Sequence, residues 1–154
     1  DGGHLHQWDD AYALYHRPAT RFVADFIGHG VFAHGQLYTT DSDIDTGHGL
    51  IAVRDPDTLH VRREFPSAGI GPHQLLACAD GGLLVANPGL GYVWVLNHRA
   101  EPVQVLRGAP GSSTTNLAFG GAGRRTVYVT DSTHGRVLRA EMSAAGLPLH
   151  ARAA

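Results

Sequence analysis

Short apolar runs, each broken by glycine, proline or aspartate, follow one another along most of this chain. Three of the runs are rich in β-branched and aromatic residues and end in Asp or Asn. They occupy residues 37–41, 83–87 and 127–131. Their last residues, Asp41, Asn87 and Asp131, are 46 and 44 positions apart. Runs of this length between turn residues predict strands, and a recurrence near 45 residues predicts a repeated unit.

Each run has further strand-like segments around it, in the same order every time. One segment precedes each run across a turn that contains glycine, which can supply the positive φ of a tight hairpin. These preceding segments are residues 30–33, 74–77 and 117–120. A third segment follows at 50–54, 92–96 and 136–140, and a fourth follows the first two units at 60–65 and 102–106. Four strands per unit predict an all-β protein made of β-propeller blades, with a β-sandwich as the alternative.

The predicted blades cover about residues 27–68, 69–110 and 111–150. Closed propellers have roughly 4 to 8 blades, so about three blades do not close a ring. Three explanations stay open: a fragment of a six- or seven-bladed propeller, two copies that complete one ring, or an open arc. We favour the fragment, because an open arc leaves edge strands and apolar faces bare. Residues 1–26 are then the remnant of a preceding blade or an irregular extension.

Equivalent positions in successive blades provide the candidate chemistry. The start of the innermost strand and the end of the second strand meet the same mouth of the central channel, so their side chains are expected to converge. The inner-strand positions are His29, His73 and Asn116, and the second set is Asp41, Asn87 and Asp131. Imidazole and amide oxygen suit a divalent cation, which can polarise a carbonyl group. The structural alternative is that these residues only close strands and cap turns.

Composition removes several classes of function. Charged residues make up 17% of the chain and the net charge is −2, which predicts no nucleic-acid partner. No run approaches the roughly 20 apolar residues of a membrane-spanning helix, so a soluble protein is expected, cytoplasmic or periplasmic. The lone cysteine, Cys78, lies in an apolar stretch and is expected in the core. Residues 41–47 begin like a calcium loop but lack the glycine and glutamate of an EF-hand, which leaves a loosely binding acidic loop possible.

The second half of the chain resembles a known family. Residues 84–96, 114–121, 125–130 and 135–140 resemble the last two blades of the gluconolactonase, senescence-marker-protein and luciferin-regenerating-enzyme family. The resemblance covers roughly residues 81–149, and the phrase at 114–121 is its most specific part. It implies a six-bladed propeller with one divalent cation, usually calcium, that hydrolyses lactones and related esters. Where that family has an Asp-Gly pair that supplies a ligand and base, this chain has His73 and Gln74.

The first half resembles a different family. Residues 28–32, 37–40, 45–53 and 64–73 look like a family of uncharacterised bacterial propeller proteins, often exported, without an assigned enzymatic activity. This resemblance spans about residues 26–78. Both resemblances imply a propeller, but they differ in what they imply for function.

Two functions therefore compete. The first is a metal-dependent lactonase or esterase with a small lactone or ester as its substrate. In that hypothesis calcium is the most probable ion, with zinc or manganese as alternatives. Its metal neighbours are Asn116, His73 and His29, its catalytic residues are His73 and Asp131, and Asp41 and Asn87 line the mouth. The second is a non-catalytic propeller module that binds a small molecule or a partner protein, and self-association that completes the ring is compatible with either.

Overall fold

The computed structural model describes residues 5, 7–9, 19, 30–43 and 45–148. Within them it has eleven strands, two short 3₁₀ helices and no α-helix. The first sheet holds β1 (Gly30–Ala33), β2 (Gln36–Ser42), β3 (His48–Arg54) and β4 (Val61–Ile70). The second holds β5 (Gln74–Ala77), β6 (Leu83–Asn87), β7 (Tyr92–Leu96) and β8 (Pro102–Arg107). The third holds β9 (Thr114–Gly120), β10 (Thr126–Asp131) and β11 (Arg136–Glu141).

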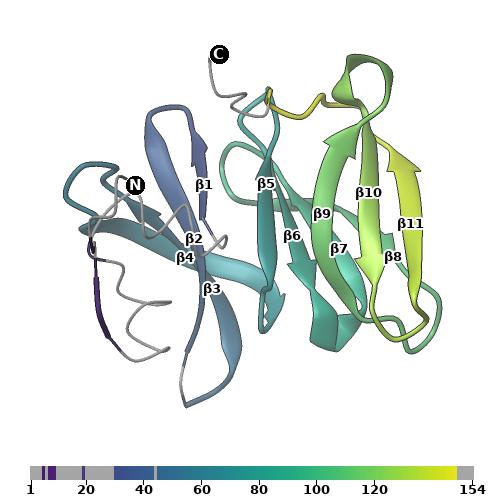
Figure 1. Ribbon diagram of the computed structural model, residues 1–154, viewed down its shortest axis with the longest axis horizontal. Helices are drawn as coiled ribbons and strands as arrows, with labels where there is room; N and C mark the ends of the chain where they lie inside the picture. Colours follow the sequence, from purple (N-terminus) through teal and green to yellow (C-terminus); the bar gives the residue numbers. More distant parts are fainter. Residues whose placement is uncertain (1–4, 6, 10–18, 20–29, 44, 149–154) are drawn as a thin grey trace.

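Each sheet is an antiparallel meander whose strands pair in chain order. The first strands of neighbouring sheets, β1, β5 and β9, lie next to one another, and the later strands fan outward (Figure 1). The sheets therefore stand as consecutive propeller blades, which confirms the predicted fold class. The connections β2–β3, β6–β7 and β10–β11 lie at the same end of the molecule (Figure 1), which we call the mouth face.

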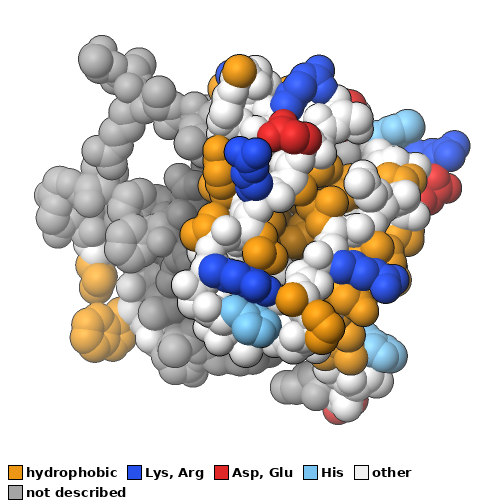
Figure 2. Space-filling view, turned by 90° about the vertical axis from the view of Figure 1, so that its right-hand side faces the viewer, with side chains coloured by type: hydrophobic (Ala, Val, Ile, Leu, Met, Phe, Trp, Pro, Cys, Tyr) orange, Lys and Arg blue, Asp and Glu red, His pale blue; other side chains and the backbone are white. Residues whose placement is uncertain are grey.

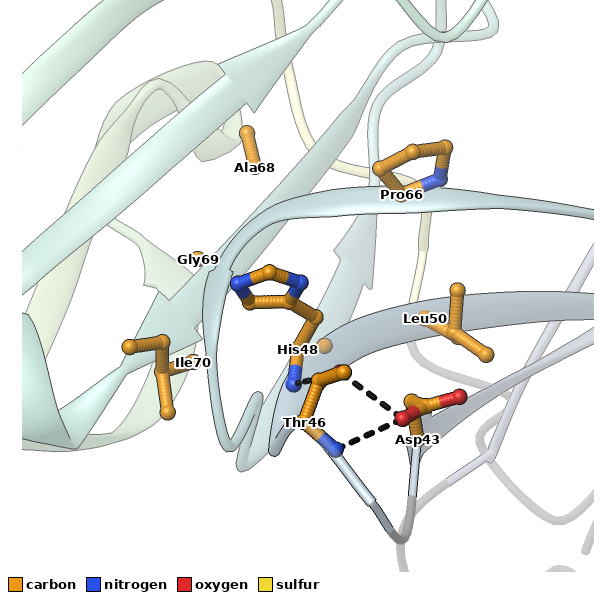
Figure 3. A pocket seen from close by; sticks show the side chains of 9 residues that line it. Asp43, Thr46, His48, Leu50, Pro66, Ala68, Gly69 and Ile70 are labelled. Carbon is orange, nitrogen blue, oxygen red and sulfur yellow. Dashed lines mark hydrogen bonds between the residues drawn. The ribbon is translucent and has the colours of Figure 1, made fainter.

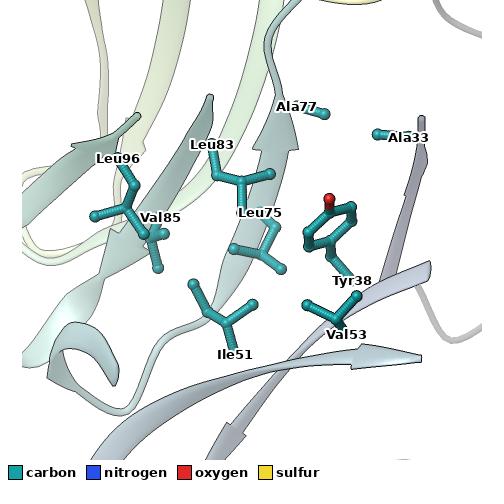
Figure 4. Close-up of a cluster of buried hydrophobic side chains, with 9 residues drawn as sticks. All are labelled: Ala33, Tyr38, Ile51, Val53, Leu75, Ala77, Leu83, Val85 and Leu96. Atoms are coloured by element: carbon teal, nitrogen blue, oxygen red, sulfur yellow. The ribbon is translucent and has the colours of Figure 1, made fainter. Parts of the chain in front are cut away.

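The first interior cluster lies between the first and second sheets (Figure 4). Ile51 and Val53 of β3 meet Leu75 of β5 and Val85 of β6, and all four side chains are almost fully buried. Tyr38 closes one side of the cluster and donates its hydroxyl hydrogen to Gln36 over 3.0 Å. Apolar burial of this kind is the main favourable contribution to joining two blades.

The second cluster lies between the second and third sheets. Leu84 and Ala86 of β6 meet Leu117 of β9 and Val127 of β10. Because successive side chains of a strand point to opposite faces, β6 supplies Leu83 and Val85 to one cluster and Leu84 and Ala86 to the other. All five residues of β6 are buried, so this strand is the centre of the described molecule.

Residues 142–148 leave the third sheet and return to the second. Met142 donates its backbone N–H to the carbonyl of Arg125, and Gly146 forms an isolated bridge with Cys78. The backbone N–H of Ala79 donates to Ala145 over 2.8 Å. Residues 142–148 therefore bond to the end of β5 and do not form a fourth strand beside β11.

Most predicted strands are confirmed with small shifts. β4 runs to Ile70 instead of stopping at 65, and it therefore crosses the predicted blade boundary at 68. β9 begins at Thr114, three residues earlier than the predicted segment. Almost all of 1–26, proposed as a remnant blade, lies outside the described residues. No helix in the described part is long and apolar enough to cross a membrane.

Candidate functional site

A pocket of about 650 Å³ opens on the mouth face, between the β2–β3 loop and the end of β4 (Figure 3). The loop contributes its polar side and β4 contributes an apolar wall. The lining residues are Asp43, Thr46, His48, Gly49, Leu50, Pro66, Ala68, Gly69 and Ile70. A mainly apolar hollow with a few fixed polar groups is the usual form of a small-molecule site.

The β2–β3 loop is organised around the carboxylate of Asp43. Its Oδ1 atom accepts hydrogen bonds from the Thr46 hydroxyl at 2.7 Å, the Thr46 backbone N–H at 2.8 Å and the Asp45 backbone N–H at 3.2 Å. The bonds from Thr46 are the main reason why the pKa of Asp43 lies below its ordinary value, and the nearby His48 lowers it further. The imidazole of His48 stands beside this loop, and His48 is paired with Ile70 where β3 meets β4 (Figure 3).

His73 and Asn87 are neighbours at the mouth-face end of the second sheet. The backbone N–H of His73 donates to the carbonyl of Ala86 over 2.9 Å, which continues the pairing of β5 with β6. Asn87 is fully buried, and its Nδ2 donates to the carbonyl of Val85 over 3.1 Å. The Thr114 hydroxyl is in contact with the carbonyl of Asn87 and donates to that of Tyr92 over 2.8 Å, so this corner also ties the second sheet to the third.

The Oδ1 atom of Asn87 is buried and has no hydrogen-bond partner among the residues that the structure describes. It lies against Gly69 of the first sheet, so close that a Cβ at residue 69 would stand only 2.1 Å from it. The close approach of the first and second sheets at the mouth face therefore depends on glycine at this position.

Asp131 is fully buried and is the centre of a polar network. Its Oδ2 accepts from the Ser112 hydroxyl at 2.8 Å and from Arg136 Nε at 3.1 Å, and it lies 2.8 Å from His134 Nδ1. Its Oδ1 accepts from the Ser113 backbone N–H at 3.1 Å. Burial alone would raise the pKa of Asp131, but these hydrogen bonds outweigh burial and hold the pKa well below its ordinary value. A carboxylate with both oxygens occupied favours a structural role in holding the β8–β9 and β10–β11 connections, and its catalytic role stays a prediction.

The remaining predicted residues are Asn116, Asp41 and His29. Asn116 is exposed on the face of β9 that is turned away from the second sheet, where its backbone N–H bonds Thr130 Oγ1 at 2.8 Å. Asp41 is half-buried on β2, and its Oδ1 accepts from the backbone N–H of Ser42. His29 lies outside the described residues. Within the described part, no group of three or more His, Cys, Asp or Glu side chains could hold a metal ion.

The described residues therefore do not by themselves fit the divalent cation that the family resemblance implies. Asn116 faces away from the interface where His73 lies, and the oxygens of Asp131 are already occupied by hydrogen-bond donors. We derive no chemical step through a metal ion. The role of a cation stays a prediction that binding measurements can test.

Thr46 and His48 were missed by sequence reasoning. The acidic loop at 41–47 was recognised as a possible weak cation site, but the hydroxyl that fixes Asp43 and the imidazole beyond it were not. The signal that could have found them is the order Asp, two residues, Thr, which favours a side-chain-capped turn. A histidine directly after such a turn starts the next strand at the mouth of the propeller.

A family model described as "Protein of unknown function (DUF1513)" matches residues 7–92, more than half of the chain. The chain belongs to this family. The match agrees with the resemblance of residues 26–78 to a family without an assigned activity. The resemblance of residues 81–149 to the gluconolactonase family is not reproduced by any family model, and it stays a prediction. No curated protein matches the DUF1513 chain.

Solved structures share the fold of this DUF1513 chain at low sequence identity. A luciferin-regenerating enzyme superposes with a TM-score of 0.60 and 18% identity, covering 78% of this chain and 46% of that one. A 6-phosphogluconolactonase-like protein from Bacteroides uniformis gives a TM-score of 0.54 and 18% identity, covering 73% and 39%. A dihydro-heme d1 dehydrogenase gives 0.50 and 18%, covering 75% and 28%. At this identity the likeness shows the propeller fold, and the chain spans less than half the length of each of these proteins.

Proposed function

We propose that the DUF1513 chain binds a small lactone or related ester in the mouth-face pocket and promotes its hydrolysis. The observation that carries the proposal is the pairing of the Asp43 loop with the His48 imidazole along one side of a pocket whose other wall is apolar. An ester has an apolar body and a polar carbonyl, and the pocket offers a surface for each. The fold that the chain shares with a luciferin-regenerating enzyme and a 6-phosphogluconolactonase-like protein supports testing this class of substrate first.

In this proposal His48 acts as the general base. Its imidazole takes a proton from water as the water oxygen attacks the carbonyl carbon of the ester. The same imidazole then returns a proton to the leaving alkoxide as the carbon–oxygen bond breaks, so no other reactant is needed. Asp43 is held as a carboxylate by Thr46, which keeps a negative charge on the loop beside His48.

The direct test is hydrolysis of simple lactones and of p-nitrophenyl acetate by the full chain. His48→Gln is expected to lower kcat/KM by about 10²-fold or more, which is the usual contribution of a positioned acid–base group. His98→Gln is the matched control, because His98 lies on the exposed β7–β8 turn, outside the pocket. Equal rates for the two variants, or no turnover by the unaltered chain, would contradict the hydrolase proposal.

Metal dependence is a separate question with its own measurement. We propose that calcium, zinc or manganese binds at the mouth face beside His73 or beside Asn116, and each residue is tested singly because the two side chains lie on different faces. Melting curves of the unaltered chain, His73→Ala and Asn116→Ala with each ion would test it, because an ion bound only by the folded state raises Tm. A melting curve that no divalent ion changes would remove the metal site and leave the hydrolase test unaffected.

A binding module without catalysis is the second candidate. It is favoured by the hydrogen-bonding of Asp131 and of Asp43 Oδ1, which stiffens the mouth face and occupies two carboxylates that could otherwise act in catalysis. In that case a lactone analogue would raise Tm through the same pocket without being turned over. Leu50→Arg, which places a charge on the lining, would abolish the effect.

A further inference from the structure

Among the residues that the structure describes, no strand pairs with the outer edge of the third sheet. The first two sheets each end in a fourth strand, whereas β11 is the last strand of the third. Four of the six residues of β11 are exposed, including Val137 at 64%. Figure 2 looks at this side of the molecule, where hydrophobic side chains lie between arginines. The backbone N–H and C=O groups along such an edge form a template for another strand.

The chain's own next segment does not fill this edge. Residues 142–148 are bonded to Arg125, to Cys78 and Ala79, and to Ala77. These bonds place the segment along the end of the second sheet that lies opposite the mouth face. A strand that completes the third sheet must therefore come from elsewhere.

Residues 20–26, which lie outside the described residues, have the sequence of an outer strand. They read Thr-Arg-Phe-Val-Ala-Asp-Phe, with Phe22, Ala24 and Phe26 alternating with Arg21, Val23 and Asp25. Alternation with period two predicts a strand with one apolar face. The segment also stands directly before β1, the place that β4 holds before β5 and β8 holds before β9. In that chain order it corresponds to the outer strand of a blade that precedes the first sheet.

The same chain cannot place this segment on its own β11. Only residues 27–29 separate it from β1, and four Cα steps reach at most roughly 14 Å. Figure 1 shows β5, β9 and β10 between β1 and β11. The two strand spacings from β9 to β11 alone take up roughly 10 Å. The distances from β1 to β5 and from β5 to β9 add to this separation.

We propose that a second copy of this chain adds its residues 20–26 to the free edge of β11, antiparallel to it, and receives the same strand in exchange. Each third sheet would then have four strands, as the first two sheets do. Two such arcs give six blades, within the range of roughly 4 to 8 in which propellers close. The proposal concerns assembly and does not depend on the hydrolytic activity proposed above.

The side chains favour one register. With Val23 opposite Arg139, Phe22 faces Ala140 and Ala24 faces Leu138, on the side where Leu138 and Ala140 already pack against the second cluster. On the other side Arg21 stands opposite Glu141 and Asp25 lies diagonal to Arg139. The two apolar pairs on the inner face and the Arg21–Glu141 pair on the outer face stabilise antiparallel pairing, whereas Phe26 falls opposite Arg136.

Disulfide trapping between two separately labelled chains tests the exchange. One chain carries a tag and Val23→Cys, and the other carries Arg139→Cys; the native Cys78 is buried. Residues directly opposite have Cβ atoms roughly 5 Å apart, which allows a disulfide after a small adjustment. We expect a mixed, reducible dimer. Val103→Cys replaces Arg139→Cys in the control, because Val103 is 61% exposed on β8 of the second sheet. Equal trapping by the two partners, or none by Arg139→Cys, overturns the proposal.

Solution mass gives an independent measurement on the full chain. Light scattering is expected to show twice the 16.4 kDa of one chain, and Val23→Pro is expected to return it to that value. Proline at 23 removes a backbone donor from the added strand, whereas Ala13→Pro changes a residue before the segment and should leave the dimer intact. Melting curves of the variants check that the described sheets still fold. A monomeric unaltered chain, or a Val23→Pro chain that stays dimeric, contradicts the exchange.

Discussion

Strands in equivalent places of the second and third sheets differ in how far they are buried. β6 is buried along its whole length, because the first sheet covers one of its faces and the third sheet covers the other. β10 occupies the equivalent place in the third sheet, yet Tyr128 and Thr130 are exposed between buried neighbours. The difference comes from the number of covering layers, because both strands are paired on both sides and β10 departs from regular pairing only at a register shift between Val129 and Asp131.

This comparison shows which strands of a propeller contribute most to its stability and which strands can vary in sequence. A strand covered on both faces is apolar at nearly every position, as β6 is before the buried Asn87. A strand covered on one face can alternate, and its free face can carry residues that serve a partner. Tyr128 and Val137 are such residues, because they are exposed and apolar on the open face of the third sheet.

The largest expected effect is the loss of a side chain from the doubly covered strand. Leu84→Ala should lower the free energy of unfolding by about 2–5 kcal/mol, because it leaves a cavity between the second and third sheets. In the Val23→Pro chain, where no second copy covers the third sheet, Val137→Ala removes an exposed side chain and should change this free energy by about 0.5 kcal/mol or less. Urea unfolding of both variants measures the difference. Similar losses would show that the two sheets are not distinguished by burial.

The junction of the first and second sheets is expected to be nearly as sensitive. Gly69→Ala brings a Cβ to within 2.1 Å of Asn87 Oδ1, so the two sheets must separate or Asn87 must move, at a cost of about 1–3 kcal/mol. Gly89→Ala is the control, because the nearest atom to its new Cβ is 3.9 Å away. Combining Gly69→Ala with Asn87→Ala should cost less than the two changes added together, since the second removes the clash. Strict additivity would contradict the contact.

The third sheet is less buried than the second, and the hydrogen bonds of Asp131 help to stabilise it. The stability of the folded chain should therefore depend on pH. The folded pKa of Asp131 lies below the ordinary value of 3.8, so the carboxylate contributes stability above that pH and loses its contribution as the pH falls through the folded value. Asp131→Asn should therefore lower Tm at pH 7, and the deficit should shrink below about pH 4. Melting curves from pH 7 to pH 2 measure it, and a deficit that stays constant with pH would contradict the argument.

Asp55 provides the matched control for Asp131. Its pKa is also lowered, first by the backbone N–H of Thr58 and then by Arg62, but the Arg62 partner is 52% exposed on the first sheet. Salt screens exposed charge pairs more strongly than buried ones. Raising the salt concentration should therefore weaken the effect of Asp55→Asn on Tm and leave most of that of Asp131→Asn.

Much of this fold could be predicted from the sequence because turn residues separate the strands of each repeat. Glycine and aspartate mark the turns, and a short apolar run such as 83–86, followed by Asn87, is typical of a strand in a chain of this kind. The early start of β9 was missed because Thr114 and Thr115 look like a loop. The extension of β4 was missed because it passes through Pro66 and Gly69, which end most strands.

The candidate site was predicted less completely, because its contacts join distant turns. Asp131 was selected by its position at the end of a strand. Its partners Ser112 and His134 come from two different connections, and no spacing in the sequence predicts that network. His48 was missed because its place beside the pocket depends on how Thr46 and Asp43 fold the loop. Equivalent offsets located the ends of β6 and β10 at Asn87 and Asp131. Asn116, predicted at the start of its strand, is the third residue of β9, and the direction of its side chain depended on the pleat of that strand.

The smallest expected effect is a difference in the rate at which cysteine thiols of the second and third sheets react. It involves no change in stability. Burial, together with the nearby Asp80, raises the pKa of Cys78 from 9.0 to about 12, so the reactive thiolate is scarce in the folded protein. Three pKa units alone predict reaction with a thiol reagent at pH 8 that is roughly 10³-fold slower than in urea. In the Val23→Pro chain, where no second copy covers the third sheet, a cysteine introduced as Val137→Cys should react at nearly its unfolded rate. Fast labelling of Cys78 in the folded chain would mean that the contact of residues 142–148 with the second sheet opens readily, and that the second sheet is less securely covered than its burial indicates.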